Sequence, residues 1–183
     1  TDSKLKNNLG LYPKLLIQNS SQLYFISDYV VLRESLILPK GTTLNILPGT
    51  QILLDKGVSI ISYGSIIAKG KKDKRVTFRP LNKYQPWGTI ALVGKGSNSV
   101  FEYCVFDGGS GAYNQGKYFS AMLSAHYIKN ININNCIFKN ASKKNGGDDS
   151  VNVKYGKVII KNSSFIKNGG DAIDFDFVDD DSS

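Results

Sequence analysis

The sequence predicts an all-β solenoid, in which a repeated unit stacks on further copies of itself. First, one stretch occurs twice: residues 131–140 read Ile-Asn-Ile-Asn-Asn-Cys-Ile-Phe-Lys-Asn, and residues 158–165 read Val-Ile-Ile-Lys-Asn-Ser-Ser-Phe. Second, short apolar runs alternate with Gly or Pro breaks, which is typical of strands and turns. Third, four phenylalanines recur 28, 32 and 27 residues apart, a period typical of solenoids. They are Phe78, Phe106, Phe138 and Phe165.

The composition is that of one folded domain. The chain has 183 residues, of which 41% are hydrophobic, with nine Phe and ten Tyr, so it has enough apolar material for a sizeable core. We expect no membrane span, because no run of about 18 apolar residues occurs. The chain begins at Thr1 without a signal-peptide pattern, and we expect a processed or excised segment.

The charge of the chain is unevenly distributed. The net charge is +8, but residues 1–170 carry 23 basic and 9 acidic residues. The other six acidic residues lie after position 170, in a stretch without Lys or Arg. A basic body favours polyanions such as an acidic polysaccharide or a cell-surface glycan. The alternative is a solvated, Lys-rich surface. The lysines are scattered, so we expect no specific nucleic-acid binding.

The two cysteines occupy one position of the repeat. Cys104 and Cys136 each stand two residues before an aligned phenylalanine, and Ser163 fills the same position in the next unit. Equivalent positions of adjacent coils stack about 4.8 Å apart. We therefore expect both cysteines to be small, inward-facing residues rather than a disulfide.

The chain divides into three parts. Residues 1–28 are predicted to be an N-terminal cap, with a short helix and a strand that cover the first coil. Residues 29–178 form the solenoid, interrupted by polar loops at 79–87 and 108–118. Residues 179–183 are an acidic tail. The strands expected before the repeated text are 30–32, 35–38, 43–47, 50–54, 58–61, 65–68, 75–78 and 89–93, and the repeated text begins at 100–106.

Three stretches resemble a known superfamily. Residues 44–50 (Leu-Asn-Ile-Leu-Pro-Gly-Thr), 64–70 (Gly-Ser-Ile-Ile-Ala-Lys-Gly) and 87–90 (Trp-Gly-Thr-Ile) resemble the opening coils of right-handed parallel β-helix proteins of the pectate-lyase-like superfamily. The later Asn-Cys-Ile-Phe and Gly-Gly-Asp units resemble parallel β-helix repeats of bacterial surface and secreted chains. The resemblance implies a right-handed parallel β-helix of about six coils and an extracellular or cell-surface location. It does not select one activity, because the superfamily includes lyases, hydrolases, epimerases, adhesins and stalks.

The last two coils are expected to place carboxylates on one outer face. If Val151, Val153 and the aligned residues of the next unit point inward, the residues between them point outward. Asn152 then stacks on Asp174, Lys154 on Asp176, and Asp149 aligns with Asp171 at the strand entrance. Asp148 joins this face.

Three interpretations of this face remain open. Carboxylate and amide oxygens suit Ca²⁺, which gives a metal site of Asp149, Asn152, Asp174 and Asp176. The resemblance implies a catalytic alternative: Lys154 as the base of a lyase that works with calcium, or Asp149 and Asp174 as the acid pair of a hydrolase. The Gly-His-Gly and Arg-x-Lys motifs of the superfamily's hydrolases are absent from the sequence. The third interpretation is a solvated face whose Asp side chains cap turns.

Several aromatic residues are candidates for ligand binding. Tyr84 and Trp87 lie in the first polar loop, and Tyr113 and Tyr118 in or next to the second. Exposed rings there are expected either to stack on sugar rings or to anchor the loops. The single histidine, His126, is placed one coil before Lys154, either on the same face as a ligand-binding group or as a hydrogen-bonded structural residue.

The sequence therefore favours a non-catalytic, cell-surface or secreted module for carbohydrate or surface binding or for structural assembly. The alternative is a polysaccharide lyase, epimerase or hydrolase that acts on an acidic glycan at the outer face of the last two coils. We call this the Asp/Lys face, and it consists of Asp148, Asp149, Asn152, Lys154, Asp171, Asp174 and Asp176. A further expectation is end-to-end self-association, because the repeats run up to residues 177–178 without an apolar cap.

Overall fold

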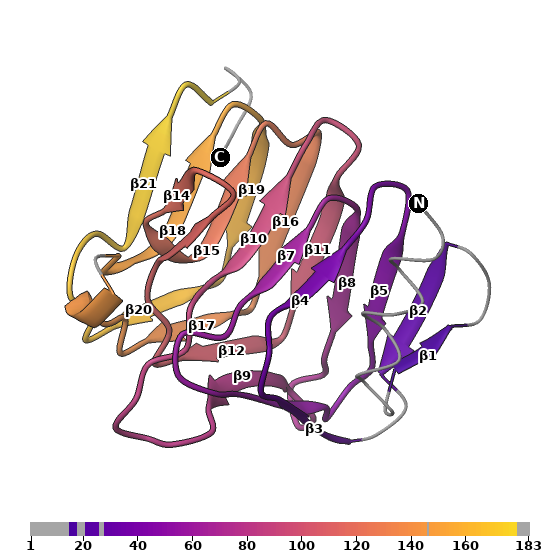
Figure 1. Ribbon diagram of the computed structural model, residues 1–183, viewed down its shortest axis with the longest axis horizontal. Coiled ribbons are helices and arrows are strands. Elements are labelled where there is room, and N and C mark those ends of the chain that lie inside the picture. The colour runs from indigo at the N-terminus through magenta and orange to yellow at the C-terminus, as the bar shows by residue number, and fades with distance from the viewer. Residues whose placement is uncertain (1–14, 18–20, 26–27, 146, 179–183) are drawn as a thin grey trace.

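The protein is a parallel β-helix, as the sequence predicts. The structure, a computed structural model, describes residues 15–17, 21–25, 28–145 and 147–178. Three parallel sheets wrap around one core, and their strands follow one another along the axis of the stack (Figure 1). Besides strands, this part of the chain has one 3₁₀ turn, Lys143–Asn145 (η1). It contains no helix with the length and apolar character needed to cross a bilayer.

Each coil contributes one strand to each of the three sheets. Sheet A contains β2 (Gln22–Phe25), β5 (Thr43–Ile46), β8 (Ser65–Lys69), β11 (Asn98–Glu102), β16 (Asn130–Asn134) and β19 (Lys157–Lys161). Sheet B contains β3 (Tyr29–Leu32), β6 (Gln51–Leu54), β9 (Val76–Pro80), β12 (Cys104–Asp107), β17 (Ile137–Lys139) and β20 (Ser164–Ile166). Sheet C contains β4 (Leu36–Leu38), β7 (Ile60–Ser62), β10 (Ile90–Val93), β15 (Ala121–His126), β18 (Asp149–Lys154) and β21 (Ile173–Asp176).

The described residues thus form six coils, in agreement with the prediction of about six. β2 already pairs in parallel with β5, so the first coil starts before residue 29. β1 (Leu15–Ile17) pairs antiparallel with β2 at the edge of sheet A. The predicted helix of the cap is not found there, because residues 15–17 are a strand. The rest of the predicted cap before residue 21 and the acidic tail 179–183 lie outside the described residues.

The core is a column of stacked side chains. The rings of Phe78 and Phe106 are 5.0 Å apart, those of Phe106 and Phe138 are 4.5 Å apart, and those of Phe138 and Phe165 are 5.2 Å apart, all nearly parallel. This confirms the predicted interior stack. Cys104 and Cys136 are buried and free, also as predicted. Each thiol lies within hydrogen-bond distance of backbone carbonyl oxygens, which satisfies it inside the core.

The corners between sheets use residues in the left-handed backbone conformation. Tyr103 (φ 48°) turns the chain from sheet A to sheet B, and Asn135 and Asn162 (φ 54° and 51°) occupy the same corner in the next coils. The stretch 100–106, where the repeated text begins, is divided at Tyr103 into β11 and β12. The inward-facing positions shift by one residue at such a corner, because the buried residues Phe101 and Cys104 are three positions apart rather than two.

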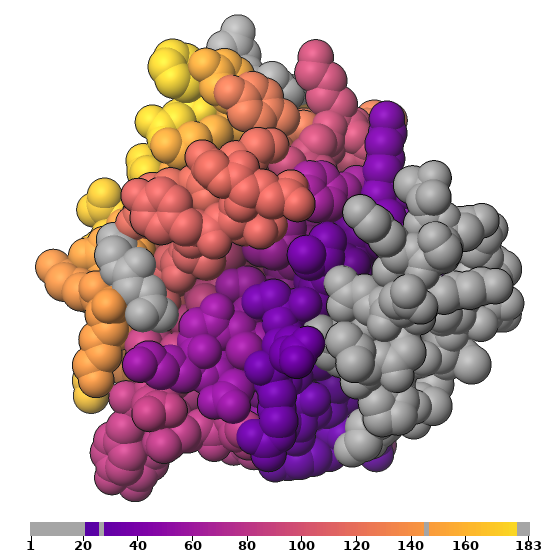
Figure 2. All heavy atoms as spheres, viewed as in Figure 1, coloured from indigo at the N-terminus to yellow at the C-terminus, as the bar shows by residue number. Residues whose placement is uncertain are grey.

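The predicted polar loop 108–118 contains an antiparallel hairpin. β13 (Ala112–Asn114) pairs with β14 (Lys117–Phe119) through a two-residue turn in which Gln115 and Gly116 both have positive φ. This turn geometry is the one that matches the twist of two-residue hairpins. The hairpin crosses in front of sheet C (Figure 1) and forms a raised salmon mass on that side of the molecule (Figure 2).

The hairpin covers part of the outer face of sheet C. Phe119 packs in a second apolar cluster with Ile61, Ala91 and Val93, which point away from the main core. Both faces of sheet C are therefore buried in the middle coils, and the face that we expected to be open to solvent is partly closed.

Candidate functional site

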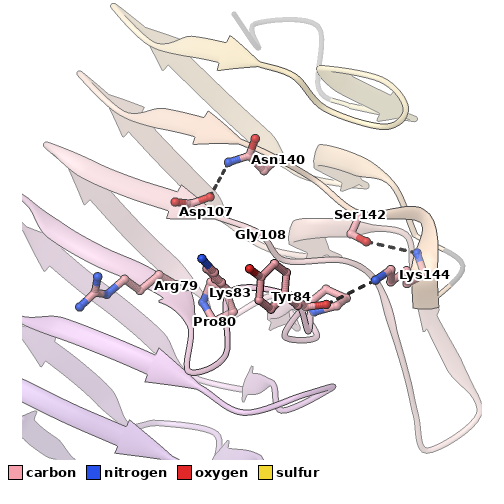
Figure 3. A pocket seen from close by; sticks show the side chains of 10 residues that line it. Arg79, Pro80, Lys83, Tyr84, Asp107, Gly108, Asn140, Ser142 and Lys144 are labelled. Carbon is pink, nitrogen blue, oxygen red and sulfur yellow. Dashed lines mark hydrogen bonds between the residues drawn. The ribbon is translucent and has the colours of Figure 1, made fainter.

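A basic cleft of about 540 Å³ lies at the corner where sheet B passes into sheet C. Three turns from successive coils surround it, because the ends of parallel strands stack at one edge (Figure 3). The lining residues of the basic cleft are Arg79, Pro80, Lys83, Tyr84, Pro86, Asp107, Gly108, Asn140, Ser142 and Lys144.

Trp87 supports the cleft from inside the protein. Its side chain is 0% exposed, and its indole Nε1 donates a hydrogen bond of 2.7 Å to the carbonyl oxygen of Asp107. Gly109 is required beside it, because a Cβ there would lie 2.6 Å from the Trp87 ring. The prediction that the Trp87 ring is exposed is wrong: its apolar surface fills the core under the loop, which agrees with the alternative that it anchors the loop.

Tyr84 is exposed, as predicted, and lies between two lysines. Its side chain is 71% exposed, and the Lys83 ammonium is 4.8 Å from the centre of its ring. The Nζ atom of Lys144 donates to the Tyr84 carbonyl oxygen at 3.3 Å. The two ammonium groups therefore both contact Tyr84, one over its ring and one at its backbone carbonyl oxygen.

The cleft carries more positive than negative charge. Arg79 donates to the side-chain oxygen of Gln51 at 2.9 Å. Within the ranges that the structure describes, neither Arg79 nor Lys83 nor Lys144 forms an ion pair with a carboxylate. The acid in the wall, Asp107, is itself neutralised by Lys139 at 3.1 Å. Its other carboxylate oxygen accepts 2.7 Å from the Asn140 amide.

The predicted register of the Asp/Lys face is confirmed, with Asn152 opposite Asp174 and Lys154 opposite Asp176. Asn152 is not open to solvent, however. Asn152 is 0% exposed. Its Oδ1 lies 2.9 Å from His126 Nε2, and its Nδ2 donates a hydrogen bond of 2.8 Å to the Asp174 carboxylate. The expectation that Asn152 points out to solvent is wrong, because His126 and the hairpin residue Phe119 close this part of sheet C.

The charged groups of this face already have partners. Lys154 and Asp176 form an ion pair of 3.0 Å, and this contact raises the pKa of the lysine. A raised pKa keeps Lys154 protonated at neutral pH, which is unfavourable for a general base. Asp148 pairs with Lys143 at 3.3 Å.

Asp149 accepts a hydrogen bond of 2.9 Å from the Asp171 amide nitrogen. Burial raises the pKa of its carboxyl, and the nearby carboxylates of Asp148 and Asp174 act in the same direction. A raised carboxyl pKa is compatible with a general acid. Because the side chain is 9% exposed, a polymer has little access to it in this arrangement.

The catalytic and metal roles of these residues stay predictions. Among the residues that the structure describes, no three His, Cys, Asp or Glu side chains gather closely enough to hold a metal ion. The proposed calcium set also includes an amide oxygen, from Asn152. Calcium titration followed by calorimetry, with Asp174→Ala as the comparison, distinguishes a calcium site from a hydrogen-bonded structural face.

Tyr113 and Tyr118 belong to the hairpin rather than to the basic cleft. They face each other across β13 and β14, with ring centres 4.7 Å apart. Tyr113 is 77% exposed and Tyr118 is 37% exposed, in agreement with their predicted exposure. Their role in ligand binding stays a prediction.

The cations of the cleft were not predicted from the sequence. Arg79 and Asp107 directly follow the aligned phenylalanines, so their common place in the repeat was available from the sequence. Lys144 carried no such signal, because it lies in a turn whose position depends on the length of the preceding insert.

Comparison of the chain with known protein families, with curated proteins and with solved structures found no match. The parallel β-helix is established by the strand topology. Membership of the pectate-lyase-like superfamily stays a prediction from the sequence.

Proposed function

We propose that this β-helix is a non-catalytic, cell-surface or secreted module that binds an acidic polysaccharide in the basic cleft. One observation carries the proposal: three cations without a carboxylate partner among the described residues line the same cleft as one exposed tyrosine ring.

The chemistry of an acidic sugar matches these groups. Arg79, Lys83 and Lys144 can donate charge-assisted hydrogen bonds to a uronate carboxylate. The Tyr84 ring offers an apolar surface for the C–H face of a pyranose, while its hydroxyl stays hydrated. The cleft volume of about 540 Å³ is within the range of ~300–1,000 Å³ that is common for small-ligand sites.

The cleft lining favours binding over hydrolysis. Glycoside hydrolysis generally requires two carboxyl groups at opposite sides of the scissile bond. The cleft lining contains one, Asp107, and Lys139 and Asn140 already occupy it. An enzyme at the Asp/Lys face remains the alternative, and the position of the hairpin is unfavourable for it.

The test is calorimetric titration with a short oligogalacturonate and, separately, with a neutral oligosaccharide of similar length. We expect the double variant Lys83→Gln/Lys144→Gln to bind the acidic sugar at least about tenfold more weakly, because two charge-assisted hydrogen bonds are lost. Tyr84→Ala is expected to weaken binding as well. Added salt should reduce the affinity of the wild type more than that of the double variant.

The matched control is Lys71→Gln/Lys72→Gln, which removes the same charge from an exposed turn between β8 and β9. An equal loss of affinity in the control would show that binding depends on net charge, and it would contradict the assignment of the binding site to the basic cleft. Retained affinity in the cleft variant would contradict it too. Release of unsaturated uronates by the wild type, detected by ultraviolet absorbance, would replace binding with lyase activity.

A further inference from the structure

Three exposed aromatic rings form a stacked column at the corner where sheet C passes into sheet A. Tyr127 and Tyr155 have ring centres 4.7 Å apart and planes 11° apart, and Tyr155 and Phe177 have values of 4.9 Å and 8°. Their side chains are 50%, 43% and 73% exposed. We call these three residues the aromatic ladder. It follows the ends of β15, β18 and β21, and therefore runs along the axis of the β-helix (Figure 1).

The backbone of the aromatic ladder is in a conformation that disfavours large side chains. Tyr127, Tyr155 and Phe177 have φ values of 57°, 56° and 57°. An L-residue with a Cβ is strained in this left-handed region, and Gly or Asn is the usual choice. One coil earlier the same corner has Gly94, with φ 102°. Aromatic residues thus occupy this exposed, strained position in three successive coils.

A groove of about 520 Å³ accompanies the aromatic ladder. Lys95 and Lys129 line it, together with Ile128 and Gly156, and its lining includes no acidic residue. Both lysines are exposed, and within the described part of the chain neither forms an ion pair with a carboxylate. The groove thus combines aromatic rings with positive charge in its lining.

We propose that the aromatic ladder is a second glycan-binding site, which holds an acidic oligosaccharide along the axis of the β-helix. The proposal rests on the proposed function for its ligand class, but it uses none of the residues of the basic cleft. C–H groups of successive pyranose rings pack on the exposed sides of the three aromatic rings. Lys95 and Lys129 bind the carboxylates on the opposite side of the sugar chain.

The stacking of the rings favours a sugar chain over a nucleic acid. The aromatic rings are stacked on one another, so their faces are largely occupied and a planar base cannot enter between them without breaking a stack. A pyranose packs against ring edges and partly exposed faces without insertion. With two sites at different corners, one chain of this protein can hold two polysaccharide segments and gain avidity on a polymer.

The experiment is calorimetric titration with tetragalacturonate, a ligand chosen because it is short. The wild type should bind two molecules per chain. Tyr155→Asn should leave one, because it removes the middle ring while Asn remains compatible with the left-handed backbone. The matched control is Tyr103→Asn, which removes a tyrosine of φ 48° from another corner and should leave both sites. Circular dichroism confirms that each variant is folded.

Combination with the cleft variant Lys83→Gln/Lys144→Gln separates the two proposals. If the cleft variant loses one site and Tyr155→Asn loses the other, both are supported. If the cleft variant alone abolishes all binding and Tyr155→Asn changes nothing, the aromatic ladder is not a glycan site and the proposed function stands. If Tyr155→Asn abolishes all binding and the cleft variant changes nothing, the proposed function fails and the ladder proposal stands.

Two other occupants would overturn the proposal. The first is a second copy of this chain. In that case sedimentation velocity would show a dimer that the substitution Tyr155→Asn dissociates, while sugar binding stays unchanged. Competition with oligodeoxythymidylate tests for single-stranded nucleic acid. If it displaces tetragalacturonate at a lower concentration, and Tyr155→Asn abolishes this displacement, the ligand of the aromatic ladder is nucleic acid.

Discussion

The imidazole of His126 and the side-chain amide of Asn152 are hydrogen-bonded at 2.9 Å under the β13–β14 hairpin. Asn152 donates its Nδ2 to the Asp174 carboxylate, so its Oδ1 faces the imidazole, and His126 Nε2 must carry the proton. The imidazole also packs 5.0 Å from the Phe119 ring of the hairpin. His126, which is 7% exposed, therefore connects the hairpin to the fourth and fifth coils.

We predict that stability falls as the pH is lowered through the titration range of His126. Burial lowers the pKa of His126, and the charges of Lys154 and Lys117 act in the same direction, while Asn152 and Asp176 oppose them. The unfolded chain then binds more protons than the folded one below the ordinary value of about 6.5. Stability from neutral His126 is complete above that pH and is lost as the pH falls through the lower folded pKa.

Thermal unfolding of the wild type and of His126→Gln between neutral and mildly acidic pH measures this effect. The variant keeps a donor for Asn152 but cannot titrate, so its unfolding temperature should depend less on pH. The contribution of Asp149 to the pH dependence of stability has the opposite sign and occurs at lower pH. The reason is that a raised carboxyl pKa favours the folded state as the pH falls. Parallel pH curves for the two proteins would contradict the assignment to His126.

Phe138→Ala should destabilise the β-helix by about 3–5 kcal/mol. Phe138 is fully buried and stacks on Phe106 and Phe165, so truncation opens a cavity in the middle of the interior column. Urea unfolding measures the difference, and Phe138→Leu should cost less because it retains more volume. A loss as small as that of an exposed substitution would show that the column is not tightly packed.

Trp87→Phe should cost about 1–3 kcal/mol, because it removes a hydrogen bond from buried surroundings while it preserves most of the apolar contact. We also expect weaker binding of oligogalacturonate, since the bond holds the Asp107 wall of the cleft. Urea unfolding measures the change in stability, and calorimetry measures the change in affinity for oligogalacturonate. Tyr84→Phe is the control for stability: its ring is exposed and should change the free energy of unfolding by about 0.5 kcal/mol or less.

Phe119→Ala should detach the hairpin from sheet C. Phe119 is 1% exposed and packs on Ile61, Ala91 and Val93, so its removal should cost about 3–5 kcal/mol and increase the binding of a hydrophobic dye. Amide exchange at residues 112–119 should accelerate. The control, Tyr113→Ala, lies on the exposed side of the hairpin and should cost about 1 kcal/mol or less. Unchanged exchange in Phe119→Ala would show that other contacts hold the hairpin.

The hairpin variant also tests the enzymatic alternative. If the Asp/Lys face acts on polysaccharide only when it is uncovered, Phe119→Ala should release unsaturated uronates that the wild type does not. We expect no release from either protein, because the ion pair with Asp176 holds Lys154 in its protonated form.

The interior of the protein could be predicted because it depends on local features. Phe106 and Phe138, each with a small residue two positions before it, have a counterpart in Phe165 with Ser163 one coil later, and this alignment specifies which side chains point inward. The register of Asn152 with Asp174 followed from the same alignment. Each of these relationships joins equivalent positions of adjacent coils, so one aligned pair sets the others.

The outer surface could be predicted only in part. Trp87 stands in a polar loop, and nothing in its neighbours indicates that its ring turns inward under Asp107. The hairpin did leave a signal, since Tyr-Asn-Gln-Gly-Lys-Tyr at 113–118 is compatible with a two-residue turn. The aromatic ladder left one too, because Tyr127, Tyr155 and Phe177 each follow an aligned residue of sheet C.

The sequence by itself determined the stack: a period of about 28 residues, alternating apolar side chains and Gly-containing turns specify parallel coils around one core. Only the tertiary structure decided which surfaces remain accessible. The basic cleft joins turns whose residues are up to 65 positions apart, from Arg79 to Lys144. The covered face of sheet C depends on where one hairpin folds back. Such contacts join non-equivalent positions, and their geometry depends on loop lengths and backbone turns that the repeat does not encode.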